Sequence, residues 1–137
     1  GGREVLDGIK GPAIHKSKEW ASWKAKPFEA VIDMDGSQPY SRVEVGYISN
    51  KPSQIFNPVA LSVSTSDDGI SWTEAVSVSI PAEGEFDSDG LKSTSVSFAE
   101  TSARYMKVKA ECLSTVPAWH HYPGRQAWLY IDEIVVE

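Results

Sequence analysis

The chain has 137 residues, of which 41% are hydrophobic and 23% charged, which is ordinary usage for one globular domain. Its formal net charge of −6 argues against nucleic acid, whose phosphates are bound mainly by Lys and Arg, and against an anionic membrane surface. No apolar run reaches 18 residues, which argues against insertion into a bilayer, and the single cysteine, Cys112, excludes an internal disulfide.

Residues 1–12, GGREVLDGIKGP, read like the middle of a longer sequence, so we expect residues 1–137 to be a single domain cut from a larger protein. The segment 17-SKEWASWKAK-26 is the only candidate helix, because Ser17 is in position to cap it and Trp20 and Trp23 are three residues apart.

From residue 28 onwards, hydrophobic residues alternate with polar ones, which predicts strands with one buried face and one solvent face. The last run, 127-AWLYIDEIVV-136, is apolar on both faces and predicts a central strand. Turn signals such as Asp35-Gly36 and Asp67-Asp68-Gly69 separate the runs. At least seven short strands predict an all-β, antiparallel β-sandwich or jelly roll. The alternating runs are 28–34, 42–48, 59–65, 75–80, 94–98 and 104–110.

Three longer stretches, 10–27, 49–57 and 111–126, show no strand pattern, and we expect them to be irregular. Loops of a sandwich gather at its two ends, where binding residues are usually found. These stretches contain all three histidines and several of the aromatic residues. Two of the histidines lie with two Trp, two Tyr and an Arg in 117-PAWHHYPGRQAWLYIDE-133, which makes this segment the first candidate for a functional loop.

The sequence gives little support for a catalytic site or for a zinc site. Nucleophilic catalysis needs a Ser or Cys beside a base, and Cys112 with His120 or His121 is conceivable, but a small packed cysteine is the simpler interpretation. His120 and His121 are adjacent, so on an extended backbone they point to opposite sides and do not share a zinc ion. Tryptophans 72 and 128 are interpreted as core residues.

Acidic residues occur in pairs at predicted turns, where Asp usually bonds to the local backbone, so no pair stands out as the two carboxylates of a glycosidase. The segment 85-EFDSDG-90 resembles the first half of an EF-hand loop. However, Val96 occupies the position of the bidentate Glu, which favours a solvated acidic loop instead.

Several motifs together resemble the discoidin-like domain, also called the coagulation factor five/eight type C domain. Its bacterial branch is the family 32 carbohydrate-binding module, and the strongest likeness is to the C-terminal domains of Bacteroides-type β-N-acetylhexosaminidases, the family 20 chitobiases. The motifs are 6-LDG-8, 20-WASW-23, 29-EAVIDM-34, 42-RVEVGYI-48, 55-IFNP-58, 64-STSDDGISW-72, 103-ARYMKVKA-110 and 127-AWLYIDEIVVE-137.

This resemblance implies an eight-stranded jelly roll, with carbohydrate-binding loops at one end and no catalytic residue of its own. It implies a structural Ca²⁺ held by Asp7, Glu133 and carbonyl groups of residues 6–12. It also implies a secreted, periplasmic or cell-surface protein. The expected partners are a glycan of the N-acetylhexosamine or galactose type and a catalytic hydrolase domain in the same chain.

Aromatic rings cover the apolar face of a sugar, and His, Arg and Tyr bond to its hydroxyl groups. Arg125 adds a rigid fork of donors that also suits an acidic sugar. For Trp119, a core role and a ligand role both remain open. The predicted ligand-binding residues are Trp20, Trp23, Phe56, Trp119, His120, Tyr122 and Arg125.

Two other functions stay open. The chain is alternatively a docking domain without sugar binding, for which the hint is the apolar, loop-borne pair Ile55-Phe56. A flat surface with the 117–126 loop packed down would favour docking. An enzyme in its own right is the third hypothesis, and turnover of a chromogenic hexosaminide would support it.

Overall fold

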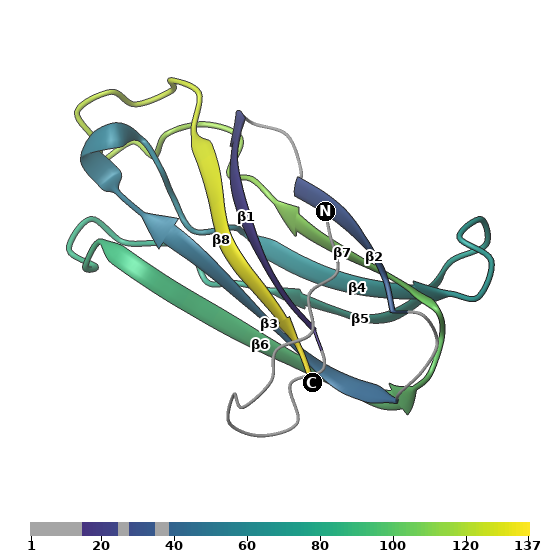
Figure 1. The fold of residues 1–137 in the computed structure, drawn as a ribbon. Coiled ribbons are helices and arrows are strands. Elements are labelled where there is room, and N and C mark those ends of the chain that lie inside the picture. Colours follow the sequence, from purple (N-terminus) through teal and green to yellow (C-terminus); the bar gives the residue numbers. More distant parts are fainter. Residues whose placement is uncertain (1–14, 25–27, 35–38) are drawn as a thin grey trace.

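The computed structural model describes residues 15–24, 28–34 and 39–137, and for residues 15–24 it describes the backbone. Two four-stranded antiparallel sheets face each other, with strand orders β1-β8-β3-β6 and β2-β7-β4-β5 (Figure 1). The all-β sandwich expected from the alternating sequence is therefore confirmed. The elements are β1 (His15–Lys24), β2 (Phe28–Asp33), β3 (Tyr40–Ser49), the 3-10 helix η1 (Lys51–Ser53), β4 (Ala60–Ser66), β5 (Thr73–Ser79), β6 (Gly90–Thr101), β7 (Tyr105–Glu111) and β8 (Trp128–Val136).

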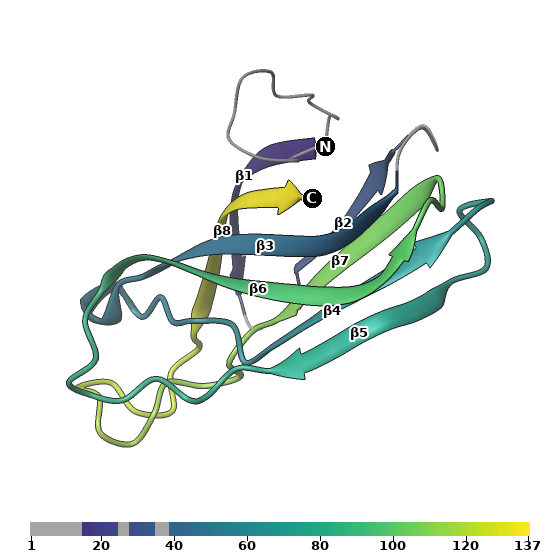
Figure 2. The ribbon, with the colours of Figure 1, turned by 90° about the horizontal axis from the view of Figure 1, so that it is seen from below.

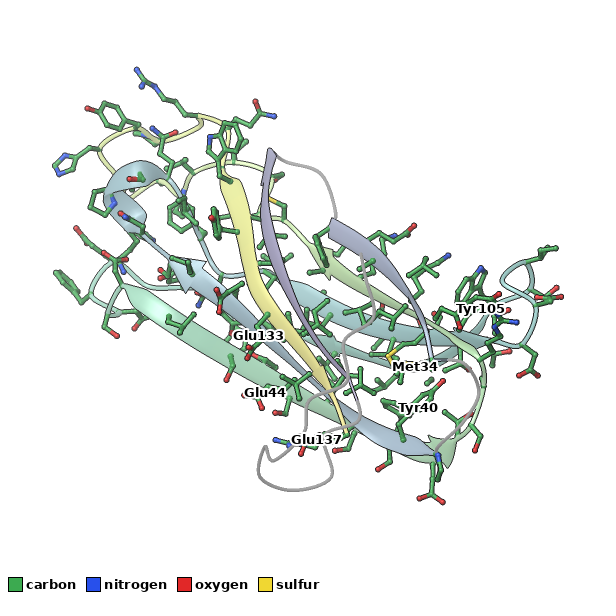
Figure 3. All side chains as sticks on the ribbon, in the orientation of Figure 1. Met34, Tyr40, Glu44, Tyr105, Glu133 and Glu137 are labelled. Atoms are coloured by element: carbon green, nitrogen blue, oxygen red, sulfur yellow. The ribbon has the colours of Figure 1, made fainter. Side chains whose placement is uncertain are left out.

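The core lies between the sheets and follows the alternation of the sequence. Val43, Val45 and Tyr47 on β3 are buried, while the residues between them are more exposed or lack a side chain. Strand β8 pairs with β1 on one edge and β3 on the other, so the run that is apolar on both faces is a central strand, as predicted. At the end far from the long loops, Met34 and Tyr40 fill the space between the layers (Figure 3).

The predicted helix at 17–26 is wrong, and so is the prediction that 15–24 is irregular. Residues 15–24 form β1, which pairs antiparallel with β8 from His15 opposite Val136 to Lys24 opposite Trp128. The register shifts between Lys18 and Ala21. A β-bulge places one extra residue in a strand and interrupts the two-residue alternation, which explains why the sequence did not show this strand.

Three connections meet at one end of the sandwich: residues 50–59, 80–89 and 112–127 (Figures 1 and 2). The first is attached to the start of β8, because Phe56 N donates to Trp128 O at 3.1 Å and Trp128 N donates to Gln54 O at 2.9 Å. Gln54 has a positive φ of 64°, which ends η1 and turns the chain toward β8. The turn between β4 and β5 lies at the opposite end (Figure 1). The irregular character predicted for 111–126 is confirmed beyond Glu111, and that for 49–57 is confirmed except for Ser49, which ends β3, and the short helix η1.

Within the described part of the chain, no helix has the length and apolar character needed to cross a membrane.

Candidate functional site

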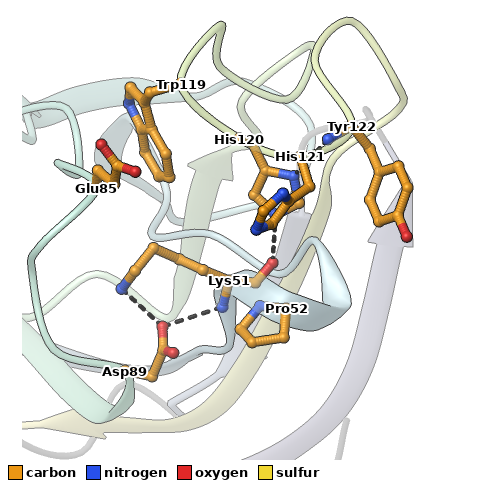
Figure 4. Close-up of a pocket in the computed structure, with 8 residues that line it drawn as sticks. All are labelled: Lys51, Pro52, Glu85, Asp89, Trp119, His120, His121 and Tyr122. Atoms are coloured by element: carbon orange, nitrogen blue, oxygen red, sulfur yellow. Dashed lines mark hydrogen bonds and ion pairs between the residues drawn. The ribbon is translucent and has the colours of Figure 1, made fainter.

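A pocket of about 560 Å³ opens where these three connections meet (Figure 4). Its size lies within the range of small-molecule sites. The η1 region, the β5–β6 connection and the β7–β8 connection each contribute to its wall. The lining residues are Lys51, Pro52, Glu85, Asp89, Trp119, His120, His121 and Tyr122.

Lys51 ties two of the connections together at the floor of the pocket. Its side chain is 11% exposed, and its Nζ donates to Asp89 Oδ1 at 2.7 Å and to the carbonyl oxygen of Asp87. The backbone N–H of Lys51 donates to the same Oδ1 at 3.0 Å. Two bonds from one residue to one carboxylate oxygen fix the 80–89 connection against η1.

Glu83 is the second anchor of this floor, and its side chain is only 3% exposed. The carboxylate accepts from Asn57 N at 3.1 Å and from the Ser49 hydroxyl, and it lies 3.4 Å from the ammonium groups of both Lys51 and Lys92. A buried carboxylate is stable only when it is paired and hydrogen-bonded, as Glu83 is here.

Lys51 and Asp89, which meet at the floor of the pocket, are both charged at neutral pH and form an ion pair. The side-chain and backbone hydrogen bonds from Lys51 hold the pKa of Asp89 below its ordinary value. Burial lowers the pKa of Lys51, but its hydrogen bond to Asp89 and the negative charges of Glu83 and Asp89 outweigh that effect and raise it. The positive charge of Lys51 is therefore satisfied inside the protein.

His120 holds one wall of the pocket in place. Its Nδ1 accepts from Tyr122 N at 3.0 Å, so this nitrogen carries no proton. The ring proton is then on Nε2, which donates to Lys51 O at 2.7 Å. Both nitrogens are used, which corrects the expectation that a His120 nitrogen bonds to a sugar hydroxyl; its ring still lines the pocket.

Phe56 lies beneath the pocket and not on its surface. It is 2% exposed and packs with Val116 and Ala127 in a small second core. Its ring meets Trp119 edge to face at 6.2 Å between centroids and His120 at 5.9 Å. The prediction that Phe56 contacts ligand is corrected, because it supports the two rings that line the pocket.

Trp119 belongs in part to the small core and in part to the wall of the pocket. Part of its ring packs on Phe56 and the small core, and the rest lines the pocket beside Glu85 (Figure 4). Tyr122, which is 45% exposed, lines the same pocket. The Arg125 guanidinium lies 4.4 Å from the centroid of the Tyr122 ring, so Arg125 flanks the pocket without lining it.

His121 is a lining residue that the sequence reasoning missed. Adjacent histidines were expected to point to opposite sides of an extended strand, yet His120 and His121 line one pocket, with ring centroids 6.3 Å apart. The backbone there is a series of turns, with His120 N donating to Pro117 O at 3.1 Å and Gly124 at φ 81°. The sequence signal for these turns was the presence of Pro117, Pro123 and Gly124 in this short segment.

Two of the predicted ligand-binding residues, Trp20 and Trp23, lie on strand β1. The backbone register sets Trp23 opposite Leu129, near the start of β8 and therefore near the loop end of the sheet. Trp20 lies within the register shift of β1. The side chains of Trp20 and Trp23 lie outside the described residues.

The expected calcium site is described only in part, because Asp7 and the carbonyl groups of residues 6–12 lie outside the described residues. Glu133 is in the middle of β8 opposite Gly46, in a shallow hollow of about 270 Å³ that Glu44 and Asp132 also line (Figure 3). Within the described residues, no group of three or more His, Cys, Asp or Glu side chains is arranged to hold a metal ion. Glu133 with its described neighbours does not by itself fit Ca²⁺, which takes six to eight oxygen ligands.

The other residues weighed from the sequence have structural surroundings. The Cys112 thiol donates to Leu113 O at 3.3 Å and packs against the main core, which agrees with a small packed cysteine. Trp72 is only partly buried, with Lys107 Nζ 4.3 Å from its ring centroid on the outside of the second sheet. The core position predicted for Trp72 is therefore wrong. Trp128, also predicted to be core, is likewise only partly buried.

No protein-family model matches this chain, and neither does any curated protein sequence. Solved structures are similar to it, and they include the following three. Module CBM32-3 of a family 31 glycoside hydrolase from Clostridium perfringens is 16% identical, with a TM-score of 0.46 over 93% of this chain and 79% of that one. The CBM32 module of AlyQ, solved with 4,5-unsaturated mannuronic acid, is 16% identical, with a TM-score of 0.46 over 97% and 82%.

The C-terminal domain of a chitobiase from Bacteroides fragilis is 20% identical, with a TM-score of 0.42 over 81% of this chain and 62% of that one. These structures come from the group of proteins that the sequence motifs resemble. Their TM-scores are all below 0.5, so the geometry of this chain carries the proposal that follows.

Proposed function

We propose that this chain is a non-catalytic saccharide-binding module and that the pocket at the loop end is its binding site. The single observation that carries the proposal is the partly exposed indole of Trp119 beside two carboxylates, Glu85 and Asp89, in one open pocket. A sugar ring has an apolar face of C–H groups and a rim of hydroxyl groups. An aromatic plane buries the face while carboxylates accept from the rim.

The polar groups that remain available support this function. In the described part of the chain, neither Glu85 nor Asp89 Oδ2 accepts a hydrogen bond, although Asp89 Oδ1 accepts from Lys51 and Ser49. The ring nitrogens of His121, which lines the same pocket, are likewise unused among the described residues. One indole plane with three polar groups around it suits a single sugar unit.

The charge of the lining favours an uncharged sugar. Lys51 is neutralised by Asp89 and Glu83, whereas Glu85 lies at the rim with no cation beside it among the described residues. Arg125, which suggested an acidic sugar, stacks on Tyr122 and does not line the pocket. A uronic or sulfated sugar would meet the negative charge of Glu85, so we infer a neutral sugar of the N-acetylhexosamine or galactose type.

The expected affinity is that of a targeting module. A hydrogen bond to a charged group contributes roughly 1.5–3 kcal/mol, and an aromatic contact adds roughly 0.5–1.5 kcal/mol. One or two of each, less the cost of association, give about −4 to −8 kcal/mol, which is a millimolar to micromolar Kd. Such binding is useful when it raises the effective concentration of a linked hydrolase domain at its substrate, in a secreted or cell-surface protein.

The test is a titration of the domain with N-acetylglucosamine, galactose, N-acetyllactosamine, chitobiose and glucuronic acid, followed by amide chemical shifts. We expect saturable shifts in residues 117–124 with neutral sugars and weaker binding of glucuronic acid. Trp119→Ala should abolish them. Trp72→Ala is the matched control, since Trp72 is also partly buried but lies beside Lys107 of β7 and does not line the pocket. An unresponsive parent protein would refute the proposal.

The alternative function, a docking domain without sugar binding, was suggested by the apolar pair Ile55-Phe56, and the position of this pair does not favour it. Phe56 is buried, and Ile55 is partly buried and bridged to Trp128 at the start of β8, so neither presents an apolar surface. The loop end contains an open pocket, where docking would favour a flat surface. Turnover of a chromogenic hexosaminide by the isolated chain, lost on a single carboxylate change, remains the observation that would establish an enzyme.

A further inference from the structure

Phe86 is the most exposed large hydrophobic side chain among the described residues, at 94%. It buries almost none of its ring against the protein. Single exposed apolar residues are common on protein surfaces, so exposure alone assigns no role. The position of Phe86 relative to the pocket is the feature that sets it apart.

Phe86 stands at the corner of a tight turn whose other corner belongs to the pocket. Asp87 N donates to Gly84 O at 3.2 Å, which closes the turn with Glu85 and Phe86 at its two corners. Glu85 lines the pocket, and Phe86 is the next residue. Phe86 is not itself a lining residue, but its backbone is directly bonded to that of one.

The turn is held on the floor of the pocket. Gly84 N donates to Asp87 Oδ2 at 2.7 Å, and the carbonyl of Asp87 accepts from the buried ammonium of Lys51. A side chain on an anchored turn loses less conformational entropy on binding than one on a free loop. Phe86 is thus exposed and also held in position.

Neither turn chemistry nor packing accounts for a phenylalanine here. Turn corners favour Gly, Pro, Asn, Asp and Ser, each of which has a backbone reason to be there. A Phe ring stabilises a protein when it is buried, but an exposed ring contributes almost nothing. An apolar ring with no partner in its own domain gains that contribution when a ligand covers it.

We propose that Phe86 is a second aromatic platform, which stacks on the sugar unit next to the one held in the pocket, so that the site binds an oligosaccharide. The proposal rests on the saccharide-binding function inferred above. The surrounding charge selects this occupant. Glu85, Asp87 and Asp89 lie on the same connection and would repel nucleic acid and an anionic membrane, whereas a neutral glycan meets no such barrier.

The affinity should therefore depend on the length of the glycan. An aromatic contact at this level makes a disaccharide bind roughly 3- to 10-fold tighter than the monosaccharide. Phe86→Ala should remove that gain and leave the Kd for the monosaccharide unchanged. Because the ring is 94% exposed, this variant keeps the stability of the parent.

The experiment uses two series, N-acetylglucosamine with its β-1,4-linked dimer and trimer, and galactose with lactose and N-acetyllactosamine. Isothermal titration calorimetry on the full chain gives each Kd for the parent, Phe86→Ala and the control Ile70→Ala. Ile70 is 81% exposed in the turn between β4 and β5, at the opposite end of the sandwich (Figure 1). We expect only Phe86→Ala to lower the dimer-to-monomer affinity ratio.

The outcomes separate the two proposals. An unchanged ratio in Phe86→Ala, or an equal loss for monomer and dimer, overturns the second platform while the pocket stands. A loss of the same size in Ile70→Ala also overturns it, because the effect is then not local to the rim. If the parent binds no sugar of either series, the saccharide-binding function falls and this inference falls with it.

Discussion

Lys51→Met tests whether the floor of the pocket is a structural unit. Methionine keeps the apolar stem of Lys51 and removes the ammonium that bonds to Asp89 Oδ1 and the Asp87 carbonyl. Breaking a fully buried ion pair costs about 3–5 kcal/mol, whereas an exposed pair contributes about 0–1 kcal/mol. Glu83 is 3% exposed but keeps Lys92 as a partner, and Asp89 is 39% exposed. We therefore expect a loss between these limits, of about 2 kcal/mol.

Urea unfolding followed by fluorescence measures this loss. With an m-value of about 2 kcal/mol/M, the midpoint should fall by about 1 M. Lys92→Met is the matched control, because Lys92 lies at the same 3.4 Å from Glu83 Oε2 but is 24% exposed and makes no described contact with the 80–89 backbone. Its expected cost is about 1 kcal/mol or less.

The double variant Lys51→Met/Glu83→Gln should recover part of the loss, because it removes a buried carboxylate that has lost one of its two ammonium partners. Amide hydrogen exchange should also become faster in residues 84–89 of Lys51→Met, since their anchor is gone. A cost in Lys51→Met no larger than in Lys92→Met, with unchanged exchange, would refute the idea that Lys51 anchors the turn carrying Glu85 and Phe86.

Three further predictions concern pH and calcium. Burial, with a smaller contribution from the charge of Asp67, raises the pKa of Tyr40 to about 12 from an ordinary 10.0. The unfolded chain then releases this proton first, so stability present below pH 10 is lost as the pH rises toward 12. The parent should lose about 2 kcal/mol more than Tyr40→Phe over this range in urea unfolding. The pKa of Asp89 is lowered by its hydrogen bonds to Lys51, so its contribution is present above an ordinary value of 3.8 and is lost as the pH falls below it. The melting temperature of Asp89→Asn should accordingly vary less than that of the parent between pH 5 and pH 2. If Glu133 holds a structural calcium with Asp7, a chelator should lower the melting temperature of the parent and leave Glu133→Gln unaffected; an insensitive parent would contradict the calcium hypothesis.

The sequence by itself determined the strands and their inner faces from residue 28 onwards. Alternation of apolar and polar residues is a local property of each strand, so Val43, Val45 and Tyr47 were assigned to the core without knowing their partners. The two-faced apolar run of β8 likewise determined that this strand is central. The absence of a strand pattern in 111–126 predicted a long connection there, and the aromatic residues and histidines of this connection predicted the candidate site.

Only the tertiary structure decided which residues of the site meet. Lys51 and Asp89 are 38 residues apart, and His120 reaches Lys51 across 69 residues, so neither contact leaves a periodic trace in the sequence. Strand β1 was missed because a bulge interrupts its alternation and its identity comes from pairing with β8. Phe56 and Trp119 are both loop aromatics in the sequence, but the bridge from Ile55 to β8 helps to place Phe56 beneath the site and Trp119 on it. Local periodicity reports which face of a strand is buried, whereas the contents of a pocket depend on how separate loops pack against one another.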